Sequence, residues 1–169
     1  MDLASLIREV PDFPKPGIRF KDITPLLRDP RALQEAVQAL AAPWRGQGVS
    51  AVLGIEARGF VFAPAVALAL SAGFVPARKP GKLPCQTVQQ RYGLEYGTDA
   101  LEVHADALRP GERVLLIDDV LATGGTLAAA CALAGRLGAQ VVGCGVLIEL
   151  CALGGRQRLA VPVASVIQA

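Results

Sequence analysis

The sequence has few of the residues that build metal centres and disulfide frameworks. It contains one histidine, His104, and four cysteines, which stand at positions 85, 131, 144 and 151 without a Cys-x-x-Cys pair. Because zinc sites use cysteine and histidine ligands at short spacings, no zinc site is expected. Disulfide frameworks belong to small secreted folds. The cysteines therefore predict reduced thiols in a cytoplasmic protein.

Strong charge and long apolar runs are also missing. The formal net charge is only +2 and the basic residues are scattered, which argues against nucleic acid as the main partner. No signal peptide is expected, because no basic start precedes an apolar stretch at the N-terminus. The most apolar run, residues 60–75, is shorter than the ~20 residues that span a bilayer and contains Pro64 and Gly73. We expect a buried helix there, and no membrane partner.

Length and composition favour one globular domain over residues 1–169. Hydrophobic residues make up 52% of the chain and charged residues 19%, a composition that excludes a disordered protein. Apolar runs predict strands at 50–55, 74–77, 100–105, 114–117, 140–150 and 161–167. Helices are expected at 2–10, 29–40, 60–72 and 127–136. This alternation predicts an α/β fold, with a parallel twisted sheet flanked by helices.

The most informative stretch is residues 114–126, Val-Leu-Leu-Ile-Asp-Asp-Val-Leu-Ala-Thr-Gly-Gly-Thr. Its apolar start suits a buried parallel strand, and Asp118 and Asp119 follow where ligands bind in open α/β sheets. A phosphate can be wrapped by the small residues that come next, Ala122, Thr123, Gly124, Gly125 and Thr126, because glycines let backbone N–H groups converge before a helix. An acid pair suits vicinal hydroxyls rather than a bare phosphate. The stretch predicts a sugar-phosphate pocket.

Two common nucleotide motifs are excluded here. The lysine of a P-loop is absent, and so is the Gly-x-Gly-x-x-Gly fingerprint of dinucleotide binding. A doubly wound sheet without this function would also place glycine in a strand-to-helix turn. It would not explain two adjacent acids at the end of a buried strand, because an unpaired buried acid costs stability.

Residues 114–126 closely resemble the 5-phosphoribosyl diphosphate (PRPP) signature of the type I phosphoribosyltransferases. Four further segments resemble the adenine phosphoribosyltransferases of that family, in the same order along the chain: residues 13–27, 56–60, 78–84 and 94–97. The resemblance extends from about residue 10 to the end. It implies a type I phosphoribosyltransferase-like fold with an N-terminal base-binding hood over about residues 1–35. It also implies a flexible active-site loop over about residues 85–99.

The resemblance also implies roles for single residues. The catalytic set is Glu95, Asp118, Asp119 and Arg58. Pyrophosphate is expected on Ala57, Arg58, Gly59, Arg78, Lys79 and Lys82. Adenine is expected on Arg19, Phe20, Lys21 and Val120, and Tyr96 accompanies Glu95 in the flexible loop. Lys21 stands where an arginine is common in relatives. This difference matters little if the main chain reads the base, and it weakens the adenine assignment if the side chain does.

Simpler interpretations remain open for several of these residues. Arg58 suits a surface turn as well as a polyanion. The cations of residues 78–82 suit a solvated face, and Phe20 suits a core as well as a base platform. Glu95 suits an exposed position on a hairpin.

The implied reaction is transfer of the phosphoribosyl group of PRPP to adenine, giving AMP and pyrophosphate. Mg²⁺ is the expected cofactor, held mainly by substrate oxygens and water with no direct protein ligand. Adenine and PRPP are the expected partners, in a homodimer. The alternatives are another base (guanine, hypoxanthine, xanthine or orotate) or a non-catalytic PRPP sensor of the same fold.

Overall fold

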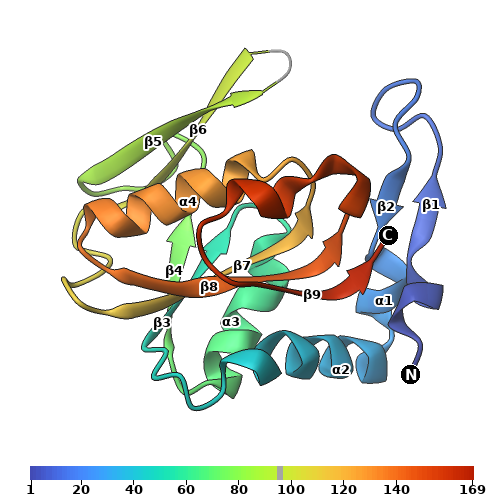
Figure 1. Cartoon of the computed structure of the whole chain (residues 1–169), viewed down its shortest axis with the longest axis horizontal. Coiled ribbons are helices and arrows are strands. Elements are labelled where there is room, and N and C mark those ends of the chain that lie inside the picture. Colours follow the sequence, from blue (N-terminus) through green and yellow to red (C-terminus); the bar gives the residue numbers. More distant parts are fainter. Residues whose placement is uncertain (95–96) are drawn as a thin grey trace.

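A five-stranded sheet forms the centre of the molecule in a computed structural model, which describes residues 1–94 and 97–169 (Figure 1). The strand order is β4-β3-β7-β8-β9, and every neighbouring pair is parallel. The strands are β3 (Ala51–Ile55), β4 (Gly73–Ala77), β7 (Arg113–Leu121), β8 (Gln140–Glu149) and β9 (Val163–Gln168). The predicted α/β class with a parallel sheet is confirmed.

Helices cover both faces of this sheet. Helices α2 (Pro30–Ala41) and α3 (Gly59–Ala69) lie on one face, and α4 (Gly125–Arg136) lies on the other (Figure 1). Side chains alternate along a strand, so Leu115 packs in the core with α2 and α3 while Leu116 packs in the core with α4. Burial on both faces explains why the central strands are continuous apolar runs.

The start of α2 follows the sequence prediction. The Asp29 side chain accepts hydrogen bonds from the N–H groups of Arg31 and Ala32 at 2.8 and 3.0 Å. Pro30 takes the first helical position, where a missing N–H has no cost. The predicted helix over residues 29–40 is confirmed.

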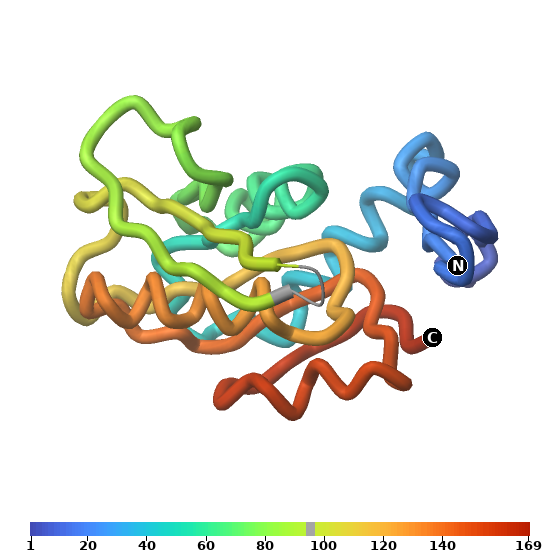
Figure 2. The backbone as a smooth tube through the Cα atoms, turned by 90° about the horizontal axis from the view of Figure 1, so that it is seen from above, coloured from blue at the N-terminus to red at the C-terminus, as the bar shows by residue number. Residues whose placement is uncertain are grey.

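Two antiparallel hairpins flank the carboxyl-terminal edge of the sheet (Figure 1 and Figure 2). One joins β1 (Arg8–Val10) and β2 (Phe20–Asp22), and the other joins β5 (Thr87–Leu94) and β6 (Gly97–His104). The short helical elements are η1 (Leu3–Leu6), α1 (Thr24–Arg28), η2 (Ala42–Trp44), η3 (Cys151–Leu153) and η4 (Gly155–Arg158).

Two sequence predictions need correction. The helix expected at 2–10 is wrong, because η1 ends at Leu6 and residues 8–10 pair with β2. The strand expected at 114–117 continues to Leu121, because β8 pairs with it through Asp118 and beyond. The acid pair therefore lies inside β7 rather than after it.

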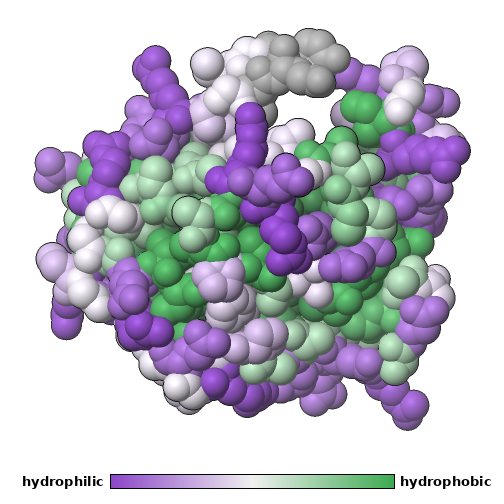
Figure 3. Space-filling view, in the orientation of Figure 1, coloured by the Kyte–Doolittle hydropathy of each residue, from purple (hydrophilic) through white to green (hydrophobic). Residues whose placement is uncertain are grey.

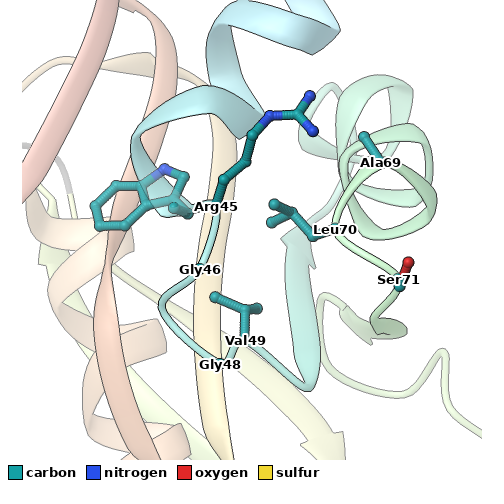
Figure 4. A pocket seen from close by; sticks show the side chains of 8 residues that line it. Arg45, Gly46, Gly48, Val49, Ala69, Leu70 and Ser71 are labelled. Carbon is teal, nitrogen blue, oxygen red and sulfur yellow. The ribbon is translucent and has the colours of Figure 1, made fainter.

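The opposite, amino-terminal edge carries a cavity of about 280 Å³. Residues that precede β3 and residues that end α3 line it, as Figure 4 shows for Arg45, Val49, Leu70 and Ser71. None of the residues predicted to bind substrate lines this cavity. On the face that carries α4, hydrophilic side chains surround hydrophobic ones gathered near the middle (Figure 3).

Candidate active site

Three loops that the sequence marked as functional meet at the carboxyl-terminal edge. They follow the neighbouring strands β4, β3 and β7, and parallel strands end at the same edge. The structure therefore brings together residues 78–82, residues 56–59 and residues 122–126. The contact is close at Gly59, where a Cβ atom would lie 2.9 Å from the Ile117 carbonyl oxygen and 3.1 Å from Asp118 Oδ1.

The acid pair in β7 is buried and incompletely hydrogen-bonded. Asp118 is 8% exposed and Asp119 is 5% exposed. Asp118 Oδ1 accepts the Asp119 N–H at 2.9 Å. Arg58 Nε lies 2.6 Å from Asp119 Oδ2 without the alignment of a hydrogen bond, so this buried oxygen has no hydrogen-bond donor among the described residues. Burial and then the negative charge of Asp119 raise the pKa of Asp118. Such a pair can accept hydrogen bonds from ligand hydroxyls.

The predicted phosphate loop lies at the N-terminus of α4. Gly124 has φ +85°, and a Cβ atom there would lie 2.5 Å from the Gly155 carbonyl oxygen. A Cβ atom on Gly155 would lie 2.2 Å from the Ala122 carbonyl oxygen, so η4 packs directly on the loop. Thr123 is exposed, while Gly125 and Thr126 are half-buried in the first turn of α4. Backbone N–H groups at such a helix N-terminus can bind an anion.

Phe20 is brought to the acid pair through Arg58. The Arg58 guanidinium lies over the Phe20 ring, 4.8 Å from its centroid, while its Nε contacts Asp119. Phe13 packs edge-on against Phe20 with 5.1 Å between ring centroids. One face of Phe20 is therefore covered by Arg58, and the N-terminal segment contacts the centre of the site.

The side chains of Arg19 and Lys21 do not join this cluster. Lys21 Nζ donates to Glu9 Oε1 at 2.6 Å, and Arg19 Nη1 lies 3.5 Å from Glu9 Oε2. Both side chains thus pair with Glu9 of β1 in this structure. Val120 is half-buried and packs against the core beneath α2 and α3.

The basic residues Arg78, Lys79 and Lys82, which we call the cation loop, are bound by carboxylates. Glu56 Oε1 lies 3.4 Å from Arg78 Nη2 and 2.5 Å from Lys82 Nζ, and Oε2 accepts the Lys79 N–H at 2.7 Å. The Lys79 ammonium pairs with Asp99. Burial raises the pKa of Glu56, but the hydrogen bonds from the cation loop outweigh burial and lower this pKa to about 2. The three predicted cations thus lie close together, and each of them pairs with a carboxylate of the chain.

Two residues predicted to act in the flexible loop, Glu95 and Tyr96, lie outside the described residues. Their neighbours in the hairpin reach the cation loop, because the Tyr92 hydroxyl lies 3.1 Å from Lys79 Nζ and 3.2 Å from Asp99 Oδ2. The hairpin and the cation loop are therefore in direct contact.

Sequence reasoning missed two charged groups. It gave no role to Glu56, and none to Glu149, which ends β8 and pairs with Arg156 at 2.9 and 2.5 Å. Ser165 Oγ also donates to Glu149 Oε2, at 2.8 Å. The signal that marked Asp118, an acid at the carboxyl end of an apolar strand, is also present at Glu56 and Glu149. No sequence pattern marked Arg156 as a residue of the site.

The carboxyl edge of one parallel sheet thus carries a buried acid pair, a glycine-containing loop at a helix N-terminus and a loop of cations. This arrangement suits a protein that binds a phosphorylated sugar with a second anionic group. A family model of the phosphoribosyl transferase domain matches residues 27–165. The chain belongs to that family.

The relatives are more specific. Adenine phosphoribosyltransferase of Myxococcus xanthus is 58% identical over 158 residues, which cover 94% of this chain and 86% of that protein. The enzyme of the same name from Solibacter usitatus is 60% identical over 94% of this chain and 91% of its own length. The sequence resemblance to adenine phosphoribosyltransferases is confirmed.

Solved structures agree with these relatives. Adenine phosphoribosyltransferase of Rhodothermus marinus has a TM-score of 0.95 at 55% identity, covering 99% of this chain and 96% of that one. The Saccharomyces cerevisiae enzyme, complexed with an imino-altritol bisphosphate and adenine, has a TM-score of 0.93 at 38% identity, covering 98% and 96%.

Proposed function

We propose that this chain transfers the 5-phosphoribosyl group of PRPP to adenine, forming AMP and releasing pyrophosphate, as an enzyme of purine salvage. The observation that carries the proposal is the buried acid pair, whose Asp119 Oδ2 has an ionic contact but no hydrogen-bond donor in the described chain. It lies beside a phosphate loop and a cation loop. Relatives of that name at 58–60% identity support the choice of base.

Asp118 and Asp119 would accept hydrogen bonds from the ribose hydroxyls. Displacement at the anomeric carbon develops positive charge on the sugar, and carboxylates fixed beside it stabilise that charge without reorganising. The N–H groups around Gly124, Gly125 and Thr126 would hold the 5-phosphate at the start of α4. The sugar is thereby anchored at both ends while its bond to pyrophosphate breaks.

The leaving pyrophosphate would be held by Arg58, the backbone of Ala57 and Gly59, and the cation loop. Among the described residues no group of three or more His, Cys, Asp or Glu side chains is placed to hold a metal. We propose that Mg²⁺ is held mainly by oxygens of PRPP and by water, with no direct protein ligand. Mg²⁺ would supply further positive charge to the pyrophosphate.

Adenine would stack on Phe20, with Val120 on its other side and main-chain groups of Arg19 and Lys21 at its edge. Arg58 covers one face of the Phe20 ring in the structure. For adenine to stack on that face, the Arg58 side chain must move away from the ring, towards the pyrophosphate. Glu95 would take the proton that the attacking base releases, and Tyr96 accompanies it.

We also propose a homodimer in the cytoplasm. Three large apolar side chains on α3 and β4 are exposed: Val61 at 41%, Leu68 at 81% and Phe74 at 38%. These side chains are candidates for a subunit contact, and sedimentation equilibrium of the purified chain would measure the oligomeric state. Every helix in the described chain falls short of the length and apolar character needed to cross a membrane.

The test is direct. The purified chain is mixed with adenine, PRPP and MgCl₂, and AMP and pyrophosphate are measured by chromatography. Equal amounts of both products, with adenine preferred over guanine, hypoxanthine, xanthine and orotate, are expected. PRPP binding without product would favour the sensor, and preference for another base would overturn the adenine assignment.

A further inference from the structure

Glu56 is a carboxylate at the carboxyl edge that joins two strands and the cation loop. Its N–H donates to the Ala77 carbonyl oxygen at 2.9 Å, which fixes the end of β3 against the end of β4. Its buried side chain then meets the cation loop at three points, through Arg78, Lys82 and the Lys79 N–H. One carboxylate thus collects the residues that would bind the leaving pyrophosphate.

A second glutamate holds the same loop without neutralising it. Arg78 forms an antiparallel bridge with Glu102 of β6, with N–H to carbonyl distances of 2.9 and 2.8 Å. Glu102 Oε2 accepts the Gly81 N–H at 3.2 Å. Within residues 1–94 and 97–169 the Glu102 side chain forms no ion pair. The chain therefore offers a matched pair of glutamates, one paired with the cations and one not.

The cation loop has binding capacity that Glu56 does not use. Arg78 Nε is a buried donor without a hydrogen-bond partner in the described chain, and a buried unpaired donor costs free energy until a ligand satisfies it. A pyrophosphate that reaches Arg78 and Lys82 also approaches the Glu56 carboxylate. Two negative groups would then share the same cations, and each weakens the hold of the other.

We propose that Glu56 is a positioning residue that arranges the cation loop for pyrophosphate while its negative charge limits how tightly pyrophosphate is retained. The inference rests on the proposed function, because it deepens the role of the pyrophosphate subsite. It assigns two opposite effects to one side chain. The hydrogen-bond acceptors of Glu56 favour binding by ordering the loop, and its charge favours release.

Two substitutions separate these effects. Glu56→Gln keeps an acceptor for the Lys79 N–H and removes the charge, so pyrophosphate should bind about tenfold more tightly, the order expected for removal of one nearby like charge in a partly solvated site. Glu56→Ala removes both, so the loop loses its anchor and pyrophosphate should bind about tenfold more weakly. A merely structural role would weaken binding in both variants.

The measurement is isothermal titration of the full chain with magnesium pyrophosphate, with Glu102→Gln as the control. The control should change the pyrophosphate dissociation constant by less than twofold. In steady state, Glu56→Gln should lower the inhibition constant of pyrophosphate by the same factor as its dissociation constant, with little change in the affinity for AMP.

Weaker or unchanged pyrophosphate binding in Glu56→Gln overturns the inference, and so does an equal gain in Glu102→Gln. If the unmodified chain forms AMP but the Glu56→Gln affinity does not rise, only this inference fails. If the unmodified chain neither forms AMP nor binds pyrophosphate, the proposed function fails and the inference fails with it.

Discussion

Neighbouring strands β7 and β8 both carry buried carboxylates towards their carboxyl ends, and the surroundings of these carboxylates differ. Glu149 is 6% exposed and receives two hydrogen bonds from Arg156 and one from Ser165. Asp119 is 5% exposed, yet its Oδ2 has only a misaligned contact with Arg58. The Arg156 guanidinium lowers the pKa of Glu149, whereas burial raises the pKa of Asp118. A satisfied buried acid serves the fold, and an unsatisfied one is available to a ligand.

The satisfied acid still supports the site. Arg156 also donates to the Val163 carbonyl oxygen at 2.6 Å, so Glu149 ties η4 to β8 and β9. Gly155 then packs on the phosphate loop at Ala122 and Gly124. We infer that the carboxylate of β8 holds the phosphate loop in place, whereas the carboxylates of β7 bind the substrate.

The largest expected effect is the loss of turnover on neutralising the acid pair. Asp119→Asn should lower kcat by on the order of 100-fold or more, because it removes a fixed charge beside the developing cation. The free energy of unfolding should change by less than about 1 kcal/mol, because Asp119 Oδ2 accepts no hydrogen bond in the described chain that the substitution would break. AMP formation and urea unfolding measure the two quantities, and near-normal turnover would refute the role of the acid pair.

The matching change on β8 should act on stability. Glu149→Gln leaves Arg156 without its counter-ion and should lower the free energy of unfolding by about 2 kcal/mol, less than a fully buried pair would lose because Arg156 can regain water. Turnover per folded molecule should fall less than fivefold. A loss of activity as large as that of Asp119→Asn would erase the distinction between the two strands.

The contact between η4 and the phosphate loop should appear in PRPP affinity. Gly155→Ala places a methyl group 2.2 Å from the Ala122 carbonyl oxygen and should raise KM for PRPP by about tenfold through displacement of the loop. Gly135→Ala is the control: it lies within α4, has open space at its Cβ, and should add roughly 0.5–1 kcal/mol of stability without changing KM. Equal KM values in both variants would contradict the contact.

The smallest effect is a change in the acid dependence of stability. The pKa of Glu56 is about 2 in the fold against 4.5 as the reference, so its contribution is full above pH 4.5 and is lost as the pH falls towards 2. Stability should therefore decline less steeply over this interval in Glu56→Gln than in the unmodified chain. The effect of Asp118 on stability has the opposite sign: its pKa is raised in the fold, so its ionisation at higher pH destabilises the folded state. Unfolding by urea across pH 2–7 measures both, and parallel curves would contradict the assignment.

The central sheet could be predicted from the sequence, because its strands are buried on both faces and therefore form apolar runs. Strands β1 and β2 could not be predicted, because residues 8–10 and 20–22 are short segments with polar side chains. They form strands only by pairing with each other. The helix expected over residues 2–10 failed for that reason: tertiary pairing overrode a local pattern.

Part of the candidate site could also be predicted from the sequence, where its residues are adjacent in the chain. Asp118 and Asp119 are adjacent in the chain and mark the site by themselves. The direction of a side chain depends on partners that are distant in sequence, so no local pattern showed that Lys21 would turn to Glu9 or that Arg58 would lie between Asp119 and Phe20. Glu56 and Glu149 had the same local signal as Asp118, and only the structure shows which of these acids are satisfied.

The central claim is that the acid pair is incomplete because ribose hydroxyls complete it. The most direct measurement is isothermal titration of the double variant Asp118→Asn, Asp119→Asn with PRPP and, separately, with pyrophosphate, both with Mg²⁺. PRPP affinity should fall by on the order of 100-fold, whereas pyrophosphate affinity should not fall, because the substitutions also remove the negative charge that pairs with Arg58. Equal changes for the two ligands, or no change for PRPP, would contradict the claim.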